Sequence, residues 1–194
     1  MAETYQRSMT AEEFLDWQLG QEDRYELIDG YPIKLMTGAT DYHDRVVTNI
    51  IAALHAQLRG KHCRVATADL AVHTRIRGFR RSDVVVTCGQ MTGDSTVAED
   101  PRLVVEVLSK SNTGIDWQRK LDEYRHLKGL AYILLVDSRL QAATLYVRSG
   151  TTWEPEDADD IEHVLKLPAI DCTLALADIY DGLTLPRPEP SERA

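Results

Sequence analysis

Residues 103–108 read LVVEVL, so a single acidic residue, Glu106, interrupts an otherwise apolar run. A continuous apolar run of this length is typical of a strand that is buried on both faces of a sheet. Upstream in the chain, Asp83 enters a second such run, Val84-Val85-Val86. The two runs therefore predict strands near the centre of a sheet, and each strand brings one carboxylate with it.

These two carboxylates need a compensating charge. An isolated carboxylate in an apolar strand loses several kcal/mol of solvation, and two nearby carboxylates raise each other's pKa unless a cation neutralises them. Hard oxygen ligands of this kind suit Mg²⁺ or Mn²⁺. We therefore expect Asp83 and Glu106 to bind a divalent metal. The alternative is that Glu106 pairs with an Arg or Lys and only stabilises the fold.

A cation is available in the helix predicted over residues 115–127. Asp116, Lys120 and Tyr124 are spaced i, i+4, i+8 and share one stripe of that helix. If Lys120 points back over the ends of the strands, its ammonium can steer a water and stabilise charge that develops on a phosphate. The alternative is an exposed helical pair between Asp116 and Lys120, which the spacing alone favours.

A third carboxylate, Glu26, lies in a strand that enters a tight turn, in the segment YELIDG at residues 25–30. The alternation of a strand places Glu26 on the same face as Ile28. Taken alone, Glu26 is equally well explained as a charge at a strand edge and as a ligand of a metal or water.

The remaining pattern predicts an α/β (α+β) fold with a mixed central β-sheet flanked by helices. An additional N-terminal helix begins at the capping box of Thr10 and Glu13, and a hairpin at residues 25–36 follows it. A long helix is expected over 41–58, and further strands over 64–68, 70–77, 82–87, 103–108 and 131–136. Residues 144–147 and 161–165 are expected to form edge strands around an acidic turn at 154–157. One domain is expected over 1–185, with a disordered tail over 186–194.

Composition limits the class of protein. The chain has 194 residues, of which 43% are hydrophobic and 27% charged, as expected for one globular domain. A net charge of −9 argues against general coating of nucleic acid but not against a nuclease whose site is built from carboxylates. The sequence predicts neither a membrane span nor a signal peptide, so we expect a cytoplasmic protein. Three widely spaced cysteines predict buried thiols rather than a disulfide or a zinc site.

Several residues near the carboxylates are candidates for substrate binding. The basic segment RIRGFRR at 75–81 precedes Asp83, and its Arg77, Arg80 and Arg81 are predicted to contact phosphate. An equally good alternative is a solvated hairpin loop. His43, in the first turn of the long helix, is expected either to orient a phosphate or a water or to be structural.

Together these segments resemble the PD-(D/E)XK nuclease superfamily and, more closely, the Uma-two family of restriction endonucleases, over about residues 9–180. The resemblance is carried by Thr10-Ala11-Glu12-Glu13-Phe14, by Tyr25 to Gly30, by His43, by Ser82-Asp83-Val84, by Val104 to Ser109, and by Asp116, Lys120 and Tyr124. It implies a restriction endonuclease-like fold. Two positions depart from the family pattern, since Ser82 replaces a proline and Leu108 stands where the motif lysine is usual.

The resemblance also implies roles for these residues. Asp83 and Glu106, with the backbone carbonyl of Val107, would hold Mg²⁺ or Mn²⁺, and Glu26 would complete the acidic site. Lys120 would take the place of the motif lysine. Lys110 is the alternative, because in extended structure its side chain would point to the same side as that of Glu106. Tyr124 and Lys110 join the candidate substrate-binding residues.

The function implied is that of a metal-dependent endonuclease that hydrolyses DNA phosphodiester bonds with a metal-activated water. DNA is the expected partner, and a homodimer is plausible because cutting both strands takes two sites. The alternative is a catalytically retired nuclease fold that acts as a nucleic-acid or protein binding module. A nucleotide-binding phosphohydrolase is disfavoured because the sequence has neither GxxxxGK[ST] nor GxGxxG.

Overall fold

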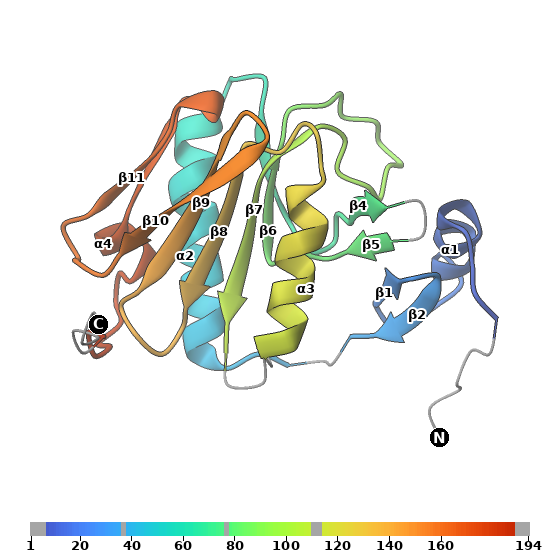
Figure 1. Ribbon diagram of the computed structural model, residues 1–194, viewed down its shortest axis with the longest axis horizontal. Coiled ribbons are helices and arrows are strands. Elements are labelled where there is room, and N and C mark those ends of the chain that lie inside the picture. Colours follow the sequence, from blue (N-terminus) through green and yellow to red (C-terminus); the bar gives the residue numbers. More distant parts are fainter. Residues whose placement is uncertain (1–6, 36–37, 76–77, 110–113, 189–194) are drawn as a thin grey trace.

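The structure is a computed structural model that describes residues 7–35, 38–75, 78–109 and 114–188 (Figure 1). Within these ranges the largest sheet has six strands in the order β10-β9-β8-β7-β6-β3. Its strands are β3 (Arg64–Thr67), β6 (Val84–Thr87), β7 (Pro101–Leu108), β8 (Tyr132–Asp137), β9 (Ala143–Ser149) and β10 (Thr152–Ala158). β7 and β8 run parallel and the other neighbours run antiparallel, which confirms the predicted mixed sheet.

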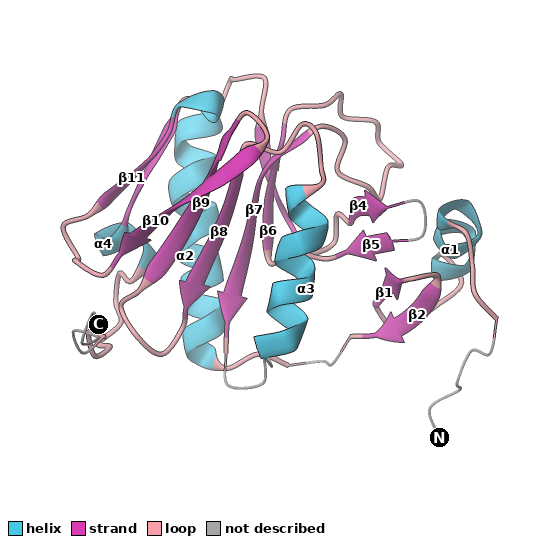
Figure 2. Cartoon of the chain, in the orientation of Figure 1, coloured by secondary structure: helices cyan, strands magenta, loops and turns pink. Residues whose placement is uncertain are grey.

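Helices cover both faces of this sheet (Figure 2). The alternating side chains of β6 and β7 explain how: Val84 and Val105 pack in one apolar cluster with α2 (Asp41–Leu58), whereas Val85 and Val104 pack in another with α3 (Gly114–Arg125). β6 and β7 are buried on both faces, as their continuous apolar sequence predicts. Asp83 and Glu106 have the parity of Val85 and Val104, so both lie on the face that α3 covers.

The N-terminal segment contributes to a second, four-stranded sheet in the order β2-β1-β5-β4. Its strands are β1 (Tyr25–Ile28), β2 (Tyr31–Lys34), β4 (Val72–Arg75) and β5 (Gly78–Arg80). Helix α1 (Ala11–Gln18) packs on it through Phe14, whose ring lies 5.7 Å from that of Phe79. The strand predicted over 70–77 is present as β4, over Val72–Arg75 only, and it pairs antiparallel with β5, which was not predicted. Residues 76 and 77 lie outside the described ranges.

The C-terminal third differs most from the sequence prediction. Residues 154–157 were expected to form an acidic turn, but they lie inside β10, where Glu154 pairs with Val147 and Asp157 pairs with Thr144 of β9. β10 is an edge strand of the sheet, so its acidic side chains have access to water. Pro155, which has no backbone N–H to donate, is tolerated there because an edge strand pairs on one side only. Sequence composition suggested a turn because it does not reveal that a strand lies at an edge.

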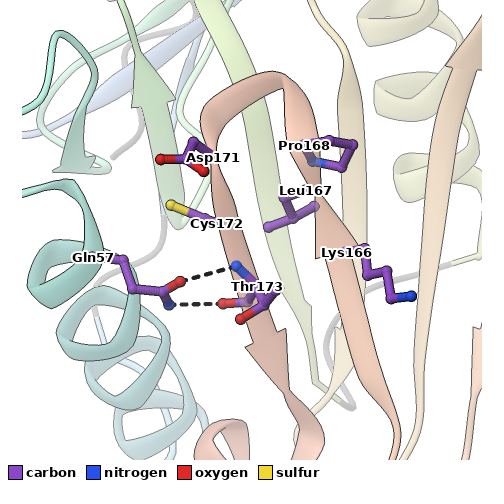
Figure 3. A pocket seen from close by; sticks show the side chains of 7 residues that line it. All are labelled: Gln57, Lys166, Leu167, Pro168, Asp171, Cys172 and Thr173. Carbon is purple, nitrogen blue, oxygen red and sulfur yellow. Dashed lines mark hydrogen bonds between the residues drawn. The ribbon is translucent and has the colours of Figure 1, made fainter.

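A small hairpin of β11 (Val164–Leu167) and β12 (Cys172–Ala175) is joined by the short helix η1 (Pro168–Ile170) and followed by α4 (Leu176–Ile179). Gln57 of α2 fixes this hairpin, because its side chain accepts a hydrogen bond from the Thr173 amide (2.9 Å) and donates one to the Thr173 carbonyl (2.7 Å) (Figure 3). A pocket of about 420 Å³ lies between this part of α2 and the hairpin.

The prediction that all cysteines are free thiols was wrong for two of them. Cys63 and Cys88 form a disulfide across 25 residues of sequence, while Cys172 is free and buried. The register of the sheet brings the two together: Arg64 of β3 pairs with Thr87 of β6, so Cys63 and Cys88 occupy the next opposed positions. Their separation along the chain gave no sign of this pairing.

The chain is still ordered where the predicted disordered tail begins, because the Pro186 carbonyl accepts a hydrogen bond from the Gln141 amide (2.9 Å). Residues 189–194 of that tail lie outside the described ranges. No helix within the described ranges is both long and apolar enough to cross a membrane.

Candidate active site

Asp83 and Glu106 face each other at the ends of neighbouring strands. Val84 of β6 pairs with Val105 of β7, so Asp83 and Glu106 occupy the next opposed positions of this antiparallel pair. The Asp83 carboxylate accepts a hydrogen bond from the backbone amide of Val107 (2.7 Å). The two carboxylates that the sequence singled out are thus brought together by strand register.

Helix α3 supplies the partners of Glu106. The Tyr124 hydroxyl donates a hydrogen bond to Glu106 Oε1 (2.7 Å), and Lys120 Nζ donates one to Oε2 (2.9 Å). One helical turn separates Lys120 from Tyr124, which places both side chains over the same strand. The predicted pairing of Lys120 with Asp116 lies outside the described side chains, whereas its pairing with Glu106 is part of the structure.

The sequence suggested Tyr124 as a substrate-binding residue, and the structure corrects this. Its side chain is fully buried among the apolar residues between α3 and the sheet, so a substrate cannot reach it. It orients Glu106 instead. Burial and the neighbouring Glu106 carboxylate raise the pKa of Tyr124, which keeps its hydroxyl protonated and able to donate.

Arg80 was also predicted to contact phosphate, and the structure corrects this. Its side chain has no exposed surface and lies between two carboxylates, with Nε 2.7 Å from Glu123 Oε2 and Nη1 2.9 Å from Glu26 Oε2. A second nitrogen, Nη2, donates to Glu123 Oε1 (2.9 Å). With all three nitrogens engaged inside the protein, Arg80 joins β5 to α3 and to β1.

Glu26 has both carboxylate oxygens committed to protein donors. Oε2 accepts from Arg80, and Oε1 accepts from the backbone amide of Arg81 (2.9 Å) and lies 3.6 Å from Lys120 Nζ. Glu26 and Glu106 therefore flank Lys120. This arrangement makes Glu26 a residue that positions the lysine.

Sequence analysis missed Glu123, the acid at the other end of Arg80. Glu123 is 4% exposed, and besides Arg80 it accepts hydrogen bonds from Arg119 (3.2 Å) and Thr74 (3.3 Å). Although burial opposes it, Arg80 and Arg119 hold the pKa of Glu123 below its usual value. One signal was available: Glu123 follows Lys120 by three residues on a helix and lies next to the buried Tyr124.

Asp83, Glu106 and Lys120 line one pocket of about 620 Å³. It is lined by Arg24, Leu35, Gly38, Ala39, Thr40, His43, Ala68, Arg81, Asp83, Glu106, Val107, Ser109 and Lys120. Glu26, Arg80, Glu123 and Tyr124 stand behind this wall and support it. The site therefore has one layer that lines the pocket, formed by Asp83, Glu106 and Lys120, and a second layer behind it that fixes their positions. Glu106 lines the pocket although it is only 4% exposed.

Two predicted substrate-binding residues line this pocket. His43 Nε2 lies 3.5 Å from Asp83 Oδ2, and Asp83 together with the Val107 backbone raises the pKa of the imidazole. Arg81 also lines the pocket, but its guanidinium donates to the backbone carbonyls of Tyr25 (3.2 Å), Ala68 (3.0 Å) and Asp69 (2.7 Å). The other two candidates, Arg77 and Lys110, lie outside the described residues.

Glu106 has an unusual acidity. Burial raises its pKa to about 7, the nearby Asp83 and Glu26 add to the rise, and Lys120 and Tyr124 oppose it. Burial alone would lower the pKa of Lys120, but Glu106 and Glu26 more than reverse this and hold it above its ordinary value. The cluster therefore combines a lysine whose charged form is favoured with a glutamate whose protonated form is favoured relative to a glutamate in water.

We expect the Glu106 carboxyl to titrate near pH 7 in the metal-free protein, which carboxyl carbon NMR on glutamate-labelled protein can measure. Asp83→Asn removes a like charge and should lower this midpoint, whereas Lys120→Met removes a favourable cation and should raise it. Because the folded pKa is raised, the contribution of Glu106 to stability is present at low pH and is lost as pH rises from about 4.5 to about 7. A midpoint near 4.5 would contradict the buried environment described above.

A central mixed sheet that carries an Asp and a Glu at neighbouring strand ends, with a Lys from a helix packed on the same face, defines a restriction endonuclease-like fold. The same architecture occurs in a solved structure described as a "putative nuclease belonging to DUF820" from Anabaena variabilis, with a TM-score of 0.69 over 88% of this chain and 97% of that one. At 18% identity this likeness shows the fold alone. Residues 11–177 match the Uma-two (Uma2) family, described as "Putative restriction endonuclease", and the chain belongs to this family.

Two relatives come from Synechocystis sp. The protein slr1290 is 30% identical over 183 residues, which cover 90% of this chain and 93% of the relative. The protein sll1609 is 27% identical over 146 residues, which cover 73% of this chain and 82% of the relative. Both are described as uncharacterized, so they extend the family without adding an activity to it.

Proposed function

We propose that this protein is a metal-dependent endonuclease that hydrolyses DNA phosphodiester bonds. The observation that carries the proposal is the convergence of Asp83, Glu106 and Lys120 on one pocket from three separate elements. A structural ion pair would explain why Glu106 and Lys120 lie together. It would not explain why a second carboxylate, that of Asp83, lies opposite Glu106 on the neighbouring strand and lines the same pocket.

The donor groups fit a small hard cation. Asp83, Glu106 and Val107 line the pocket together, and two carboxylates with a backbone carbonyl, here proposed to be that of Val107, are typical ligands of Mg²⁺ and Mn²⁺. No group of three His, Cys, Asp or Glu side chains within the described residues is arranged to hold a metal. Mg²⁺ does not require one, because it is commonly bound through one or two carboxylates with water and substrate phosphate completing its shell.

A bound Mg²⁺ or Mn²⁺ would supply Lewis acidity to a phosphoryl oxygen and increase the acidity of water in the site. The protein supplies the rest. Lys120 places an ammonium beside the carboxylates, where it stabilises negative charge that develops on the phosphate. Tyr124 fixes one oxygen of Glu106, and Glu26 holds Lys120 from the opposite side, so both groups are oriented before substrate arrives.

Contacts with DNA are proposed to come from basic residues at the rim of the pocket. Arg24 lines it and has a 58% exposed side chain, paired with Asp69 at 2.6 Å. Arg81 lines it as well, and His43 stands next to Asp83. Local positive charge of this kind is compatible with a net charge of −9, because it is needed only where phosphate binds. We further propose a homodimer, since cutting both strands takes two sites.

The test is Mn²⁺ binding by calorimetry together with nicking of supercoiled plasmid, on the wild type and on Asp83→Asn. Loss of one carboxylate from the proposed site should weaken Mn²⁺ binding about tenfold or more and reduce nicking in parallel. The matched control is Asp159→Asn, an exposed acid on the loop after β10, which should change neither.

Three outcomes separate the proposals. Parallel loss of binding and nicking in Asp83→Asn supports the endonuclease. A wild type that binds Mn²⁺ and DNA but does not nick supports a retired nuclease fold that acts as a binding module. A wild type that binds no divalent metal overturns the metal-dependent mechanism and leaves the cluster as a structural network.

A further inference from the structure

A second pocket of about 340 Å³ adjoins the candidate active site. It is lined by Thr40, Asp41, Tyr42, Ser109, Ser138 and Arg139. Thr40 and Ser109 line both pockets, so the two lie next to each other. This second pocket, the side slot, takes no part in the proposed endonuclease mechanism.

The side slot lies where parallel strands end. Leu108 of β7 is in register with Asp137 of β8, and Ser109 and Ser138 follow these two residues directly. The two loops are fastened together, because both the amide and the hydroxyl of Ser138 donate to the Leu108 carbonyl (3.0 and 2.8 Å). Clefts outside the carboxyl ends of parallel strands are frequent ligand sites. The floor of the side slot is therefore rigid backbone.

Two side chains present flat surfaces at this slot. Tyr42, in the first turn of α2, is 47% exposed, so its ring is accessible to a ligand. Arg139 is 48% exposed and its guanidinium is fixed by Asp137, with Nε and Nη2 at 3.0 and 2.6 Å from the two carboxylate oxygens. Because Asp137 and the nearby Asp41 balance its charge, the slot is poorly suited to phosphate.

An aromatic ring and a fixed guanidinium plane without surplus positive charge suit a nucleobase. Bases of single strands stack on aromatic side chains and on Arg planes irrespective of sequence, because every base has a π-face. In a duplex the bases are stacked on one another, so a base enters such a slot only if it is unpaired or flipped out. Because Thr40 and Ser109 line both pockets, a base in the side slot would lie next to a phosphate in the catalytic pocket.

We propose that the side slot binds the unpaired base of a nucleotide adjoining the scissile phosphate, stacked on Tyr42, and that the substrate is therefore single-stranded or locally unpaired DNA. This inference rests on the proposed function, since it takes the phosphate next to Asp83 and Glu106 as the reacting one. It deepens that proposal by assigning the class of DNA.

The experiment measures binding of a fluorescent single-stranded oligonucleotide containing 2-aminopurine, and of its fully paired duplex, first in EDTA and then in Ca²⁺. The wild type should bind the single strand more tightly than the duplex and quench the 2-aminopurine. Tyr42→Ala should weaken single-strand binding about tenfold and abolish the quenching, while Tyr42→Phe retains both. Tyr31→Ala is the matched control, because Tyr31 is also 47% exposed but lies on β2, away from the slot.

The outcomes for the side slot differ from those for the endonuclease. Equal single-strand binding by Tyr42→Ala and the wild type overturns the base slot, as does an equal loss in Tyr31→Ala. A wild type that prefers the paired duplex overturns it as well. Plasmid nicking by the same preparations with Mn²⁺ tests the endonuclease separately. If the wild type nicks plasmid but Tyr42→Ala does not weaken single-strand binding, the base slot is overturned and the endonuclease is supported. If Tyr42→Ala weakens single-strand binding but the wild type does not nick, the endonuclease is overturned and the slot is a site for an unpaired base alone.

Discussion

Lys120→Met is expected to lower the rate of plasmid nicking by about 10²–10³-fold, the range found when one preorganised donor to a developing charge is removed. Lys120 Nζ is the one cationic group of the described chain that contacts both Glu106 (2.9 Å) and Glu26 (3.6 Å) and also lines the pocket. The loss should appear in kcat, because the ammonium acts on charge that forms during the reaction.

Mn²⁺ binding should behave in the opposite way. Lys120→Met frees Glu106 Oε2 from its ammonium partner, so calorimetry at a pH above the Glu106 midpoint of both proteins should show the variant binding Mn²⁺ at least as tightly as the wild type. Glu106→Gln should instead lose both binding and nicking. The control is Lys128→Met, an exposed lysine beyond the end of α3. If Lys120→Met nicks DNA at the wild-type rate, Lys120 has no catalytic role and Lys110 becomes the candidate.

Arg80→Met is expected to destabilise the fold by about 3–5 kcal/mol, the cost of removing one partner from a buried ionic cluster. The substitution leaves Glu26 and Glu123, each with a 5% exposed side chain, without the cation between them. For a chain of this length the melting temperature should fall by about 6–20 °C. Thermal unfolding followed by circular dichroism measures it.

The pH dependence identifies the cause. Arg80 holds the pKa of Glu123 below its usual value against the effect of burial, so the stability it contributes is present above about pH 4.5 and is lost as pH falls. The deficit of Arg80→Met should therefore be larger at pH 7 than at pH 4. Neutralising both acids in the triple variant Glu26→Gln, Arg80→Met, Glu123→Gln should restore part of the stability. Arg102→Met, which breaks an exposed pair with Asp100, should cost less than about 1 kcal/mol.

Much of the fold was predictable because its central elements have simple patterns. The apolar runs at 84–86 and 103–105 placed two strands at the interior of the sheet, and helical periodicity gave α2 with the same bounds as the structure, Asp41–Leu58. β4 lies within the strand expected over 70–77, but the edge strand β10 and the strand β5 were missed. Their sequences are acidic and basic, and only their partners in the sheet make them strands.

The candidate site was predictable in part, for a related reason. A carboxylate within an apolar strand is costly, so Glu106 could be recognised without knowing what compensates it. Helical spacing alone favoured an exposed pair of Lys120 with Asp116, because spacing does not tell which face of a helix meets the sheet. The role of Lys120 in the site was implied by the family resemblance. Glu123 gave no comparable signal, because an acid on a helix is usually solvated.

The sequence by itself determined the central strands, the flanking helices and the two carboxylates, since burial preferences and helical or strand periodicity act locally along the chain. The tertiary structure alone decided that Arg80 and Tyr124 support the site from inside, that Glu26 holds Lys120, and that Cys63 meets Cys88. These outcomes depend on strand register and on the packing of α3 against two sheets. Local sequence patterns do not reveal these contacts, because each contact joins residues that are far apart in the chain and meet only when the strands and helices pack.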